Sequence, residues 1–151
     1  MSEIRLRTMS RSNTRTVAKT AAKSVATRAA LEAAKTQSFA IDAARLMSEL
    51  KCSEIVILDL LGRSQICDYM LIANGTSQRQ MKSVGEAIDK LGSTQGSPAW
   101  RTDADSGTSW IVIDFVDVVV HLFEPTQRAF YDIEGLWTEA PRLTWRVPAK
   151  K

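Results

Sequence analysis

The sequence predicts an α/β (α+β) domain in which helices pack on a mixed central sheet of about five strands. Three observations lead to this prediction. Two β-branched runs, 54–60 and 67–74, follow a stretch whose apolar residues recur at helical spacing. A second helical pattern begins after Ser77, and a strand-rich segment, 109–124, precedes a proline that can start a helix. The expected order of elements is α-β-β-α-β-β-β-α.

The first helix of the domain is predicted over residues 38–51, with Ser38 as its N-cap. Its apolar positions are Phe39, Ala40, Ala43, Ala44, Met47 and Leu50. A turn through residues 62–64 joins the two strands that follow.

The second helix is predicted from a turn at Asn74-Gly75 and from Ser77 and Gln80, which have the spacing of a capping box. Its buried stripe is Met81, Val84, Ile88 and Leu91. Residues Gly92, Gly96 and Pro98 are expected to end this helix. A short strand is predicted near residues 98–102, before a polar loop.

The last helix is predicted to begin at Pro125. Its expected buried positions are Phe130, Ile133, Leu136 and Trp137. The tail from residue 139 onward is expected to be irregular. We expect that Leu143, Trp145 and Val147 clip this tail onto the surface of the domain.

The segment SWIVIDFVDVVVHLFE, residues 109–124, predicts a β-hairpin that turns at Phe115-Val116 and places Trp110 opposite His121. One face is a core face with Ile111, Ile113, Val118, Val120 and Leu122. The other face is apolar in the middle and acidic at the tip, with Trp110, Val112, Asp114, Asp117, Val119, His121 and Phe123. Aromatic anchors with a charged rim are typical of interface hot spots, so we expect a basic protein partner here.

An alternative for this second face stays open: the first or the last helix covers it, and Trp110 and His121 are core residues. His121 is the only histidine of the chain, and no G-x-S-x-G elbow accompanies it. A lone histidine in an apolar strand is usually structural, so we predict no catalytic residue at this position.

An enzymatic alternative uses other residues. Gly75-Thr76-Ser77 could hold a phosphate at a helix start, and Asp103, Asp105 and Asp114 could bind magnesium, as in a nucleotidyltransferase. Ordinary helix capping and a solvated turn explain the same residues.

Metal and cofactor sites are not expected. Cys52 and Cys67 form no C-x-x-C pair, and one histidine is too few for a zinc site. We expect two reduced, packed thiols.

The charge of the chain is unevenly distributed. Residues 1–37 carry eight Lys/Arg and two Glu (8 − 2 = +6), whereas residues 38–151 carry twelve Lys/Arg and fifteen Asp/Glu (12 − 15 = −3). With almost no large apolar side chains, residues 1–37 are predicted to be a basic disordered extension that contacts RNA weakly and without sequence preference, or an organelle transit peptide. No apolar run is long enough for a membrane span, so we expect a cytoplasmic protein, or a mitochondrial or chloroplast one if the extension is a transit peptide.

Three segments together resemble the ribosomal silencing factor family, also called the Iojap family. They contain, in order, the motifs D-Y-x-x-I-A-x-G-x-S-x-R-Q, W-x-x-x-D-x-x-D-V-V-V-H and R-x-F-Y-x-x-E-x-L-W, and the resemblance covers residues 38–138. It implies a nucleotidyltransferase-like fold without enzymatic activity. It also implies a translation repressor that binds the large ribosomal subunit through the ribosomal protein numbered fourteen and blocks joining of the small subunit. Organelle relatives assist biogenesis of the large subunit, and the family includes homodimers.

The resemblance assigns partner-binding residues to two motifs. The hairpin supplies Trp110, Val112, Asp114, Phe115, Asp117, Val119 and His121, and the strand-to-helix segment supplies Tyr69, Thr76, Ser77, Arg79 and Gln80. In the last motif, Tyr131, Glu134 and Trp137 are expected mainly to pack, with Arg128 paired to Asp132 or Glu124. This chain departs from the family at Val116, where glycine is usual, and at DADSG, which replaces Glu-Gly before the tryptophan.

Overall fold

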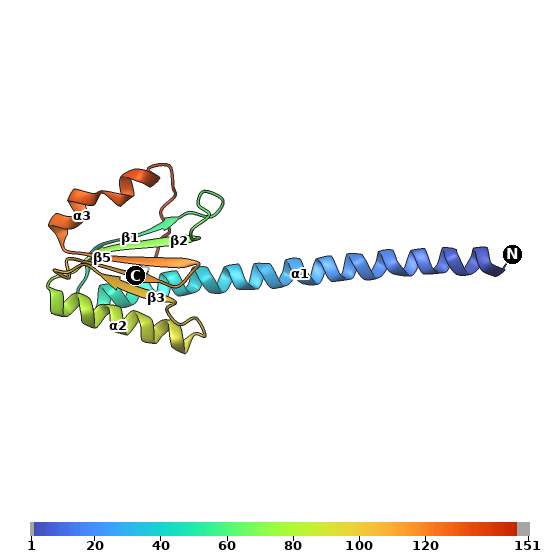
Figure 1. Cartoon of the computed structure of the whole chain (residues 1–151), viewed down its shortest axis with the longest axis horizontal. Helices are drawn as coiled ribbons and strands as arrows, with labels where there is room; N and C mark the ends of the chain where they lie inside the picture. The colour runs from blue at the N-terminus through green and yellow to red at the C-terminus, as the bar shows by residue number, and fades with distance from the viewer. Residues whose placement is uncertain (1, 148–151) are drawn as a thin grey trace. The chain divides into compact units, whose positions relative to one another are not determined.

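The structure is a computed structural model that describes the backbone of residues 2–147 and the side chains of residues 17–147. A five-stranded mixed sheet has the order β1-β2-β5-β4-β3, in which β2 and β5 are parallel and the other neighbours antiparallel. The strands are β1 Ser53–Asp59, β2 Tyr69–Asn74, β3 Arg101–Ala104, β4 Trp110–Asp114 and β5 Val118–Phe123. The helices are α1 Ser2–Glu49, α2 Gln78–Thr94, α3 Pro125–Tyr131 and the 3₁₀ helix η1 Ile133–Trp137 (Figure 1). The predicted fold class and order of elements are confirmed.

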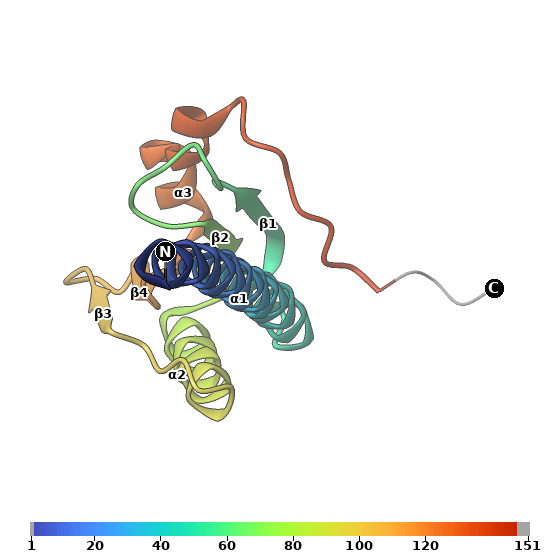
Figure 2. The same cartoon turned by 90° about the vertical axis from the view of Figure 1, so that its right-hand side faces the viewer.

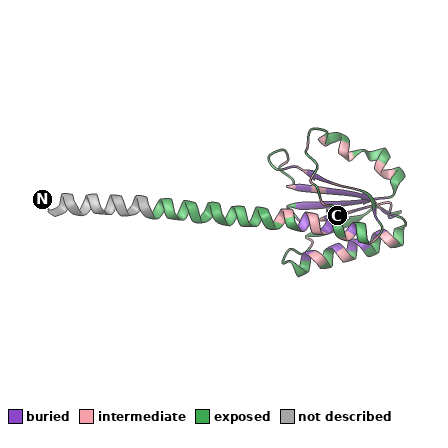
Figure 3. Ribbon diagram, turned by 180° about the vertical axis from the view of Figure 1, so that it is seen from behind, coloured by how far each residue is buried: buried purple, intermediate pink, exposed green. Residues whose placement is uncertain are grey.

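The chain divides into two compact units, Met1–Lys35 and Thr36–Lys151, and the boundary between them falls within helix α1. The helix expected to start at residue 38 is therefore the last part of a longer one, and that predicted start is corrected. Residues 17–35 are helical although all of them are exposed (Figure 3). Alanine, lysine and arginine favour helix intrinsically, but a helix without a packed face gains no stability from tertiary contacts. That the extension is mobile stays a prediction.

One face of the sheet is covered by the second unit's part of α1 and by α2 (Figures 1 and 2). The predicted core face of the hairpin is confirmed, since its five aliphatic residues are buried in this layer. Residues Phe39, Ala40, Ala43, Ala44 and Met47 of α1 and Met81, Val84 and Ile88 of α2 pack in the same cluster. Helix α2 ends at Thr94, and Gly96, with a left-handed φ of 82°, directly follows its C-cap Gln95, so the helix ends within the segment predicted to end it.

The other face of the sheet is covered by α3, η1 and residues that follow them (Figures 1 and 2). Ile133 and Trp137 pack there, as predicted, but Phe130 and Leu136 are exposed, so the predicted buried stripe is only half right. The cause is local: Asp132 adopts a left-handed φ of 43°, which ends α3 after seven residues and changes the direction of the chain. The helical periodicity of the sequence therefore does not continue across Asp132.

Arg128 ties this second layer to the sheet. Its Nε lies 2.7 Å from Glu134 Oε1, and its Nη1 donates to Asn74 Oδ1 at 3.0 Å and to the Glu54 carbonyl. The expected pairing of Arg128 with Asp132 or Glu124 is thus wrong. Glu134 is the partner because η1 turns back toward α3.

The C-terminal segment lies along the outer edge of β1. The Leu143 N–H donates to the Ile57 carbonyl at 2.9 Å, and Trp145 Nε1 donates to the Ile55 carbonyl at 3.2 Å. The predicted clip is confirmed for Leu143 and Trp145, whereas Val147 is exposed. Because an uncovered edge strand invites pairing with other chains, this segment protects β1.

Candidate functional site

The hairpin of β4 and β5 has a register two residues away from the predicted one. Trp110 lies opposite Phe123, Val112 opposite His121 and Asp114 opposite Val119. Because side chains alternate with a period of two, this shift leaves each residue on its predicted face. The change comes from a longer loop at the tip, residues 115–117.

The tip contains a γ-turn centred on Val116. The Asp117 N–H donates to the Phe115 carbonyl at 3.0 Å, and Val116 has a φ of 74°. A β-branched residue is strained in this region of φ, where glycine is favoured. The Asp114 carboxylate accepts the Val116 N–H at 2.7 Å and so holds the turn. Val116 itself is exposed.

His121 is a buried core residue, which decides between the two interpretations of the second face. Its Nδ1 accepts the indole N–H of Trp110 at 3.0 Å, and burial lowers the pKa of its imidazole to about 4. The ring is therefore neutral at physiological pH. The rings of Trp110 and Phe123 lie beside it, with centroids 5.8 Å and 6.1 Å from that of His121. The Trp110 ring also stacks on Phe123 at 4.9 Å and packs at a tilt against Tyr131 at 4.7 Å.

Several predicted partner-binding residues are interior. Val119, His121, Phe115 and Tyr69 are all buried, and Trp110 and Val112 are only partly exposed. The predicted outward orientation of this face is corrected, because α3 and η1 cover it. Phe115 packs on the Phe39 ring at 4.8 Å and beside Gly92, where a Cβ would lie 2.7 Å from the Phe115 ring.

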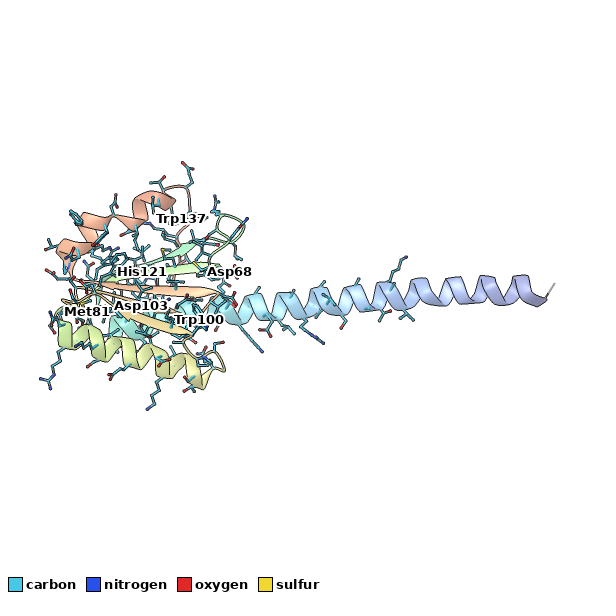
Figure 4. The ribbon with its side chains drawn as sticks, in the orientation of Figure 1. Asp68, Met81, Trp100, Asp103, His121 and Trp137 are labelled. Atoms are coloured by element: carbon cyan, nitrogen blue, oxygen red, sulfur yellow. The ribbon has the colours of Figure 1, made fainter. Side chains whose placement is uncertain are left out.

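One group of accessible acidic and apolar side chains lies at one end of the sheet, which we call the hairpin end; Phe130 and Leu136, on the layer of α3 and η1, are exposed elsewhere. Strands β1 and β4 finish there, and β2, β3 and β5 begin there. It comprises the loop 60–68, the tip 115–117, residues 98–101, and the strand-end residues Asp59 and Asp114. Asp68 and Trp100 lie at this end, and Met81 lies at the opposite one (Figure 4).

Four carboxylates make the hairpin end acidic: Asp59, Asp68, Asp114 and Asp117. Burial, then the charges of Asp117 and Asp59, raise the pKa of Asp68. Burial and then Asp68, Asp114 and Asp117 raise the pKa of the Cys67 thiol to about 11. These carboxylates are therefore close enough to repel one another, and a cationic partner would relieve that repulsion.

Exposed apolar side chains surround these acids. Ile66 is 78% exposed and Trp100 is 69% exposed, and Leu61 and Val116 are exposed as well. Leu61, Ile66 and Trp100 were not predicted as site residues. For Leu61 and Ile66 the sequence signal was their position between two predicted strands, where large apolar side chains have no periodic face to join. Trp100 was predicted to lie in a short strand, whereas β3 begins only at Arg101. Arg63 and Arg101 also lie here, and Arg101 Nε is paired with Asp103 at 2.8 Å.

Apart from Tyr69, which begins β2 at the hairpin end, the second predicted surface motif lies at the other end of the sheet. Ser77 caps α2 by accepting the Gln80 N–H at 3.0 Å, and Gln80 Oε1 accepts the Thr76 N–H at 3.0 Å, so the predicted capping box is observed in a slightly different form. Thr76, Ser77 and Arg79 are exposed, and Gln80 is partly buried. Since β2 separates this motif from the hairpin tip, the structure does not bring the two predicted partner motifs into one patch.

The carboxylates of the enzymatic alternative are also apart. Asp105 accepts the N–H groups of Ser109 and Trp110 at 2.6 Å and 2.9 Å, and these bonds and the Ser109 hydroxyl lower its pKa. Asp114 stands at the opposite end of β4, and Asp103 is paired with Arg101. Within residues 17–147, no group of three His, Cys, Asp or Glu side chains is arranged to hold a metal ion. The arrangement therefore gives the magnesium-dependent hypothesis no support.

Both cysteines are free and buried, as expected of packed thiols. Burial raises the pKa of Cys52, which opposes thiolate formation. Among the described helices, none has the length and apolar character of a membrane span.

A sheet covered on both faces, with acidic and exposed apolar groups at one end, defines a binding domain whose specificity lies in its surface. Comparison with known families shows to which family this domain belongs. A family model described as "Ribosomal silencing factor during starvation" matches residues 31–151. The chain belongs to the ribosomal silencing factor family, and the resemblance noted in the sequence is confirmed.

Individual relatives agree with this assignment. The chain is 34% identical over 101 residues to ribosomal silencing factor RsfS of Halalkalibacterium halodurans, covering 67% of this chain and 86% of the relative. It is 33% identical over 107 residues to the chloroplastic protein Iojap of Zea mays, covering 71% and 46%. A mouse relative, 25% identical over 96 residues and covering 62% and 42%, is named mitochondrial assembly of ribosomal large subunit protein 1. These names describe regulatory and assembly roles in bacteria and in organelles.

Solved structures support the same fold. A crystal structure of a protein from Chromobacterium violaceum is 28% identical, with a TM-score of 0.61, and the match covers 77% of this chain and 93% of that chain. A crystal structure from Bacillus halodurans is 30% identical, with a TM-score of 0.58, and covers 72% and 95%.

Proposed function

We propose that this protein silences translation by binding the large ribosomal subunit through its ribosomal protein numbered fourteen, so that the small subunit cannot join. Membership of the family supports the general role. The finer statement rests on one observation: four exposed apolar side chains of the loops at the hairpin end, Leu61, Ile66, Trp100 and Val116, lie among the clustered acids there. A basic ribosomal protein would neutralise the acids and cover the apolar groups.

The proposed docking surface differs from the one expected from the hairpin alone. Asp114 and Asp117 are kept, and Leu61, Ile66, Trp100 and Val116 replace the buried members of the hairpin motif. The buried residues Phe115, Val119 and His121 then act by holding the tip in place. Silencing by this route is steric: a patch of roughly 800 Å² per partner suffices for specific binding, and its occupancy excludes the small subunit. No covalent step is needed, so we propose no catalytic role.

Charge reversal tests the acidic part of this surface. Asp117→Lys should weaken co-sedimentation with purified large subunits by about tenfold or more, because it places like charges face to face. Glu86→Lys makes the same charge change on exposed α2 and should bind as wild type does. Wild-type binding by Asp117→Lys would refute the proposed surface.

Trp100→Glu tests the apolar part. Trp100 is largely exposed, so this change should leave the domain folded while it weakens binding by a similar factor. Leu136→Glu, on exposed η1, is the matched control. Trp110→Glu is unsuitable, since the Trp110 ring packs on Phe123 and Tyr131 and its loss would disturb the fold. In a joining assay with purified subunits, wild type should lower the yield of joined particles, and Trp100→Glu should restore it.

A further inference from the structure

The basic extension has features that the folded domain does not explain. It carries +6 of formal charge, against −3 for residues 38–151. The described side chains of residues 17–35 are all exposed, including Lys19, Lys23, Arg28 and Lys35. A helix without a buried face contributes little to a hydrophobic core, so its charge needs another explanation.

The basic residues of the extension follow a regular spacing. Positions 7, 11, 15, 19 and 23 are all Arg or Lys, four residues apart, and helix α1 is continuous through them. Residues four apart on a helix are about 6 Å apart along the axis, so the backbone positions of these five residues form a slowly winding row of about 24 Å, which we call the ridge. A row of evenly spaced cations suits a polyanion with regularly repeated charges.

We propose that this ridge binds the phosphate backbone of RNA without sequence preference. That this RNA is ribosomal RNA rests on the proposed function, because ribosomal RNA is the polyanion of the particle that the domain would bind. Lysine and arginine bind phosphates mainly through release of condensed counterions, which gives affinity without base contacts. The ridge is therefore a second ribosome-binding element.

Composition favours RNA over a membrane surface. Interfacial membrane helices carry a broad apolar face with large or aromatic side chains. The extension has no aromatic residue before Phe39, and alanine is its commonest apolar residue. Its described large apolar residues, Val17, Val25 and Leu31, are few. Such a helix gains little from insertion among lipids.

The attachment point makes the two binding elements cooperate. The chain enters the second unit at Thr36, and Phe39, three residues later, packs on Phe115 just beneath the hairpin tip. The extension is therefore tethered at the same end of the domain as the proposed docking surface. Once one element is bound, the tether raises the effective concentration of the other without any additional interaction.

The test measures binding of the full chain to an RNA duplex of arbitrary sequence by electrophoretic mobility shift at several salt concentrations. Wild type should bind, with log affinity falling linearly against log salt. Lys19→Gln/Lys23→Gln should lower the slope by about two, one for each phosphate that is no longer neutralised, and should weaken binding by about tenfold or more at low salt. Glutamine keeps the helix propensity of lysine, so the helix itself is preserved.

Lys82→Gln/Lys90→Gln is the matched control, since it removes two exposed lysines from α2. It should bind RNA as wild type does. An equal loss in this control, or no loss in Lys19→Gln/Lys23→Gln, would overturn the proposal. Tighter binding to anionic phospholipid vesicles than to RNA at physiological salt would also overturn it, in favour of a membrane.

The two proposals fail separately. Asp117→Lys should weaken binding to the isolated ribosomal protein by about tenfold or more and leave RNA affinity unchanged or slightly increased. Lys19→Gln/Lys23→Gln should weaken RNA binding and leave binding to the isolated ribosomal protein unchanged. If RNA binding is absent while Asp117→Lys still weakens co-sedimentation, only the role of the extension is wrong. If RNA binding is present and Asp117→Lys has no effect on co-sedimentation, only the docking surface is wrong.

Discussion

Val116 adopts a backbone conformation that is unfavourable for a β-branched residue. The γ-turn at the hairpin tip needs a positive φ, which glycine adopts without steric cost, and this chain places valine there. The turn persists because the Asp114 carboxylate and the strand hydrogen bonds on either side hold it. The strain is located where the proposed partner docks, as is common at functional sites.

Val116→Gly should therefore raise the free energy of unfolding by about 1 kcal/mol, because glycine adopts this φ without steric cost. Urea denaturation measures the change. Val116→Ala keeps the Cβ and most of the strain, so it should stay within about 0.5 kcal/mol of wild type. A glycine variant no more stable than the alanine variant would show that the turn is unstrained.

At the scale of elements, the layer formed by α3 and η1 depends on few anchors. Helix α3 has only seven residues. Hydrogen bonds from Arg128 to Glu54 of β1 and Asn74 of β2 join this layer to the sheet. The Arg128 and Glu134 side chains are 12% and 22% exposed, so their ion pair is largely shielded from water. A shielded pair of this kind is costly to break, since Glu134 would keep only the longer and more exposed pair with Arg142, at 3.6 Å.

Arg128→Ala should lower the free energy of unfolding by about 2–3 kcal/mol. Hydrogen exchange should show that residues 125–137 lose protection before the sheet does. Arg101→Ala breaks an ion pair whose side chains are 64% and 58% exposed, and it should cost no more than about 0.5 kcal/mol. Equal effects of the two substitutions would mean that Arg128 does not anchor the layer.

At the scale of the whole molecule, the separation of charge organises the proposed function. The acidic domain and the basic extension are suited to different partners, a basic protein and an RNA, and the chain passes from one unit to the other at Thr36. The stability of the whole domain also depends on one titrating group in its core. The folded pKa of His121 is about 4, below its ordinary value of 6.5.

Between about pH 6.5 and about pH 4 the unfolded chain therefore binds a proton that the folded chain does not. The contribution of neutral, buried His121 to the free energy of unfolding is complete above the pKa of the unfolded state. It declines as pH falls, by roughly 3 kcal/mol between these two pH values. His121→Gln removes the titration, and its side-chain carbonyl can still accept the Trp110 N–H. Urea denaturation at pH 7, 5.5 and 4 should show wild type losing stability relative to this variant. Parallel curves for the two proteins would mean that His121 is not buried in its neutral form.

The sequence by itself determined the order of the elements, the five-stranded sheet, the core face of the hairpin and the family. These depend on local periodicity, capping and ordered motifs, which are properties of neighbouring residues. The two faces of the hairpin were predicted correctly although the register was wrong, because a shift of two residues preserves the alternation of side chains.

Only the tertiary structure decided which face of the hairpin is covered. The reversal at Asp132 and the bonds from Arg128 to Asn74 and Glu54, distant in sequence, place α3 and η1 over Trp110 and His121. The tertiary structure also brought Leu61 and Ile66 of the loop 60–68 together with Trp100 of the segment 98–101 at the end that carries Asp117. The physical reason is that burial depends on which segments meet in space, and local patterns of polarity do not contain that information.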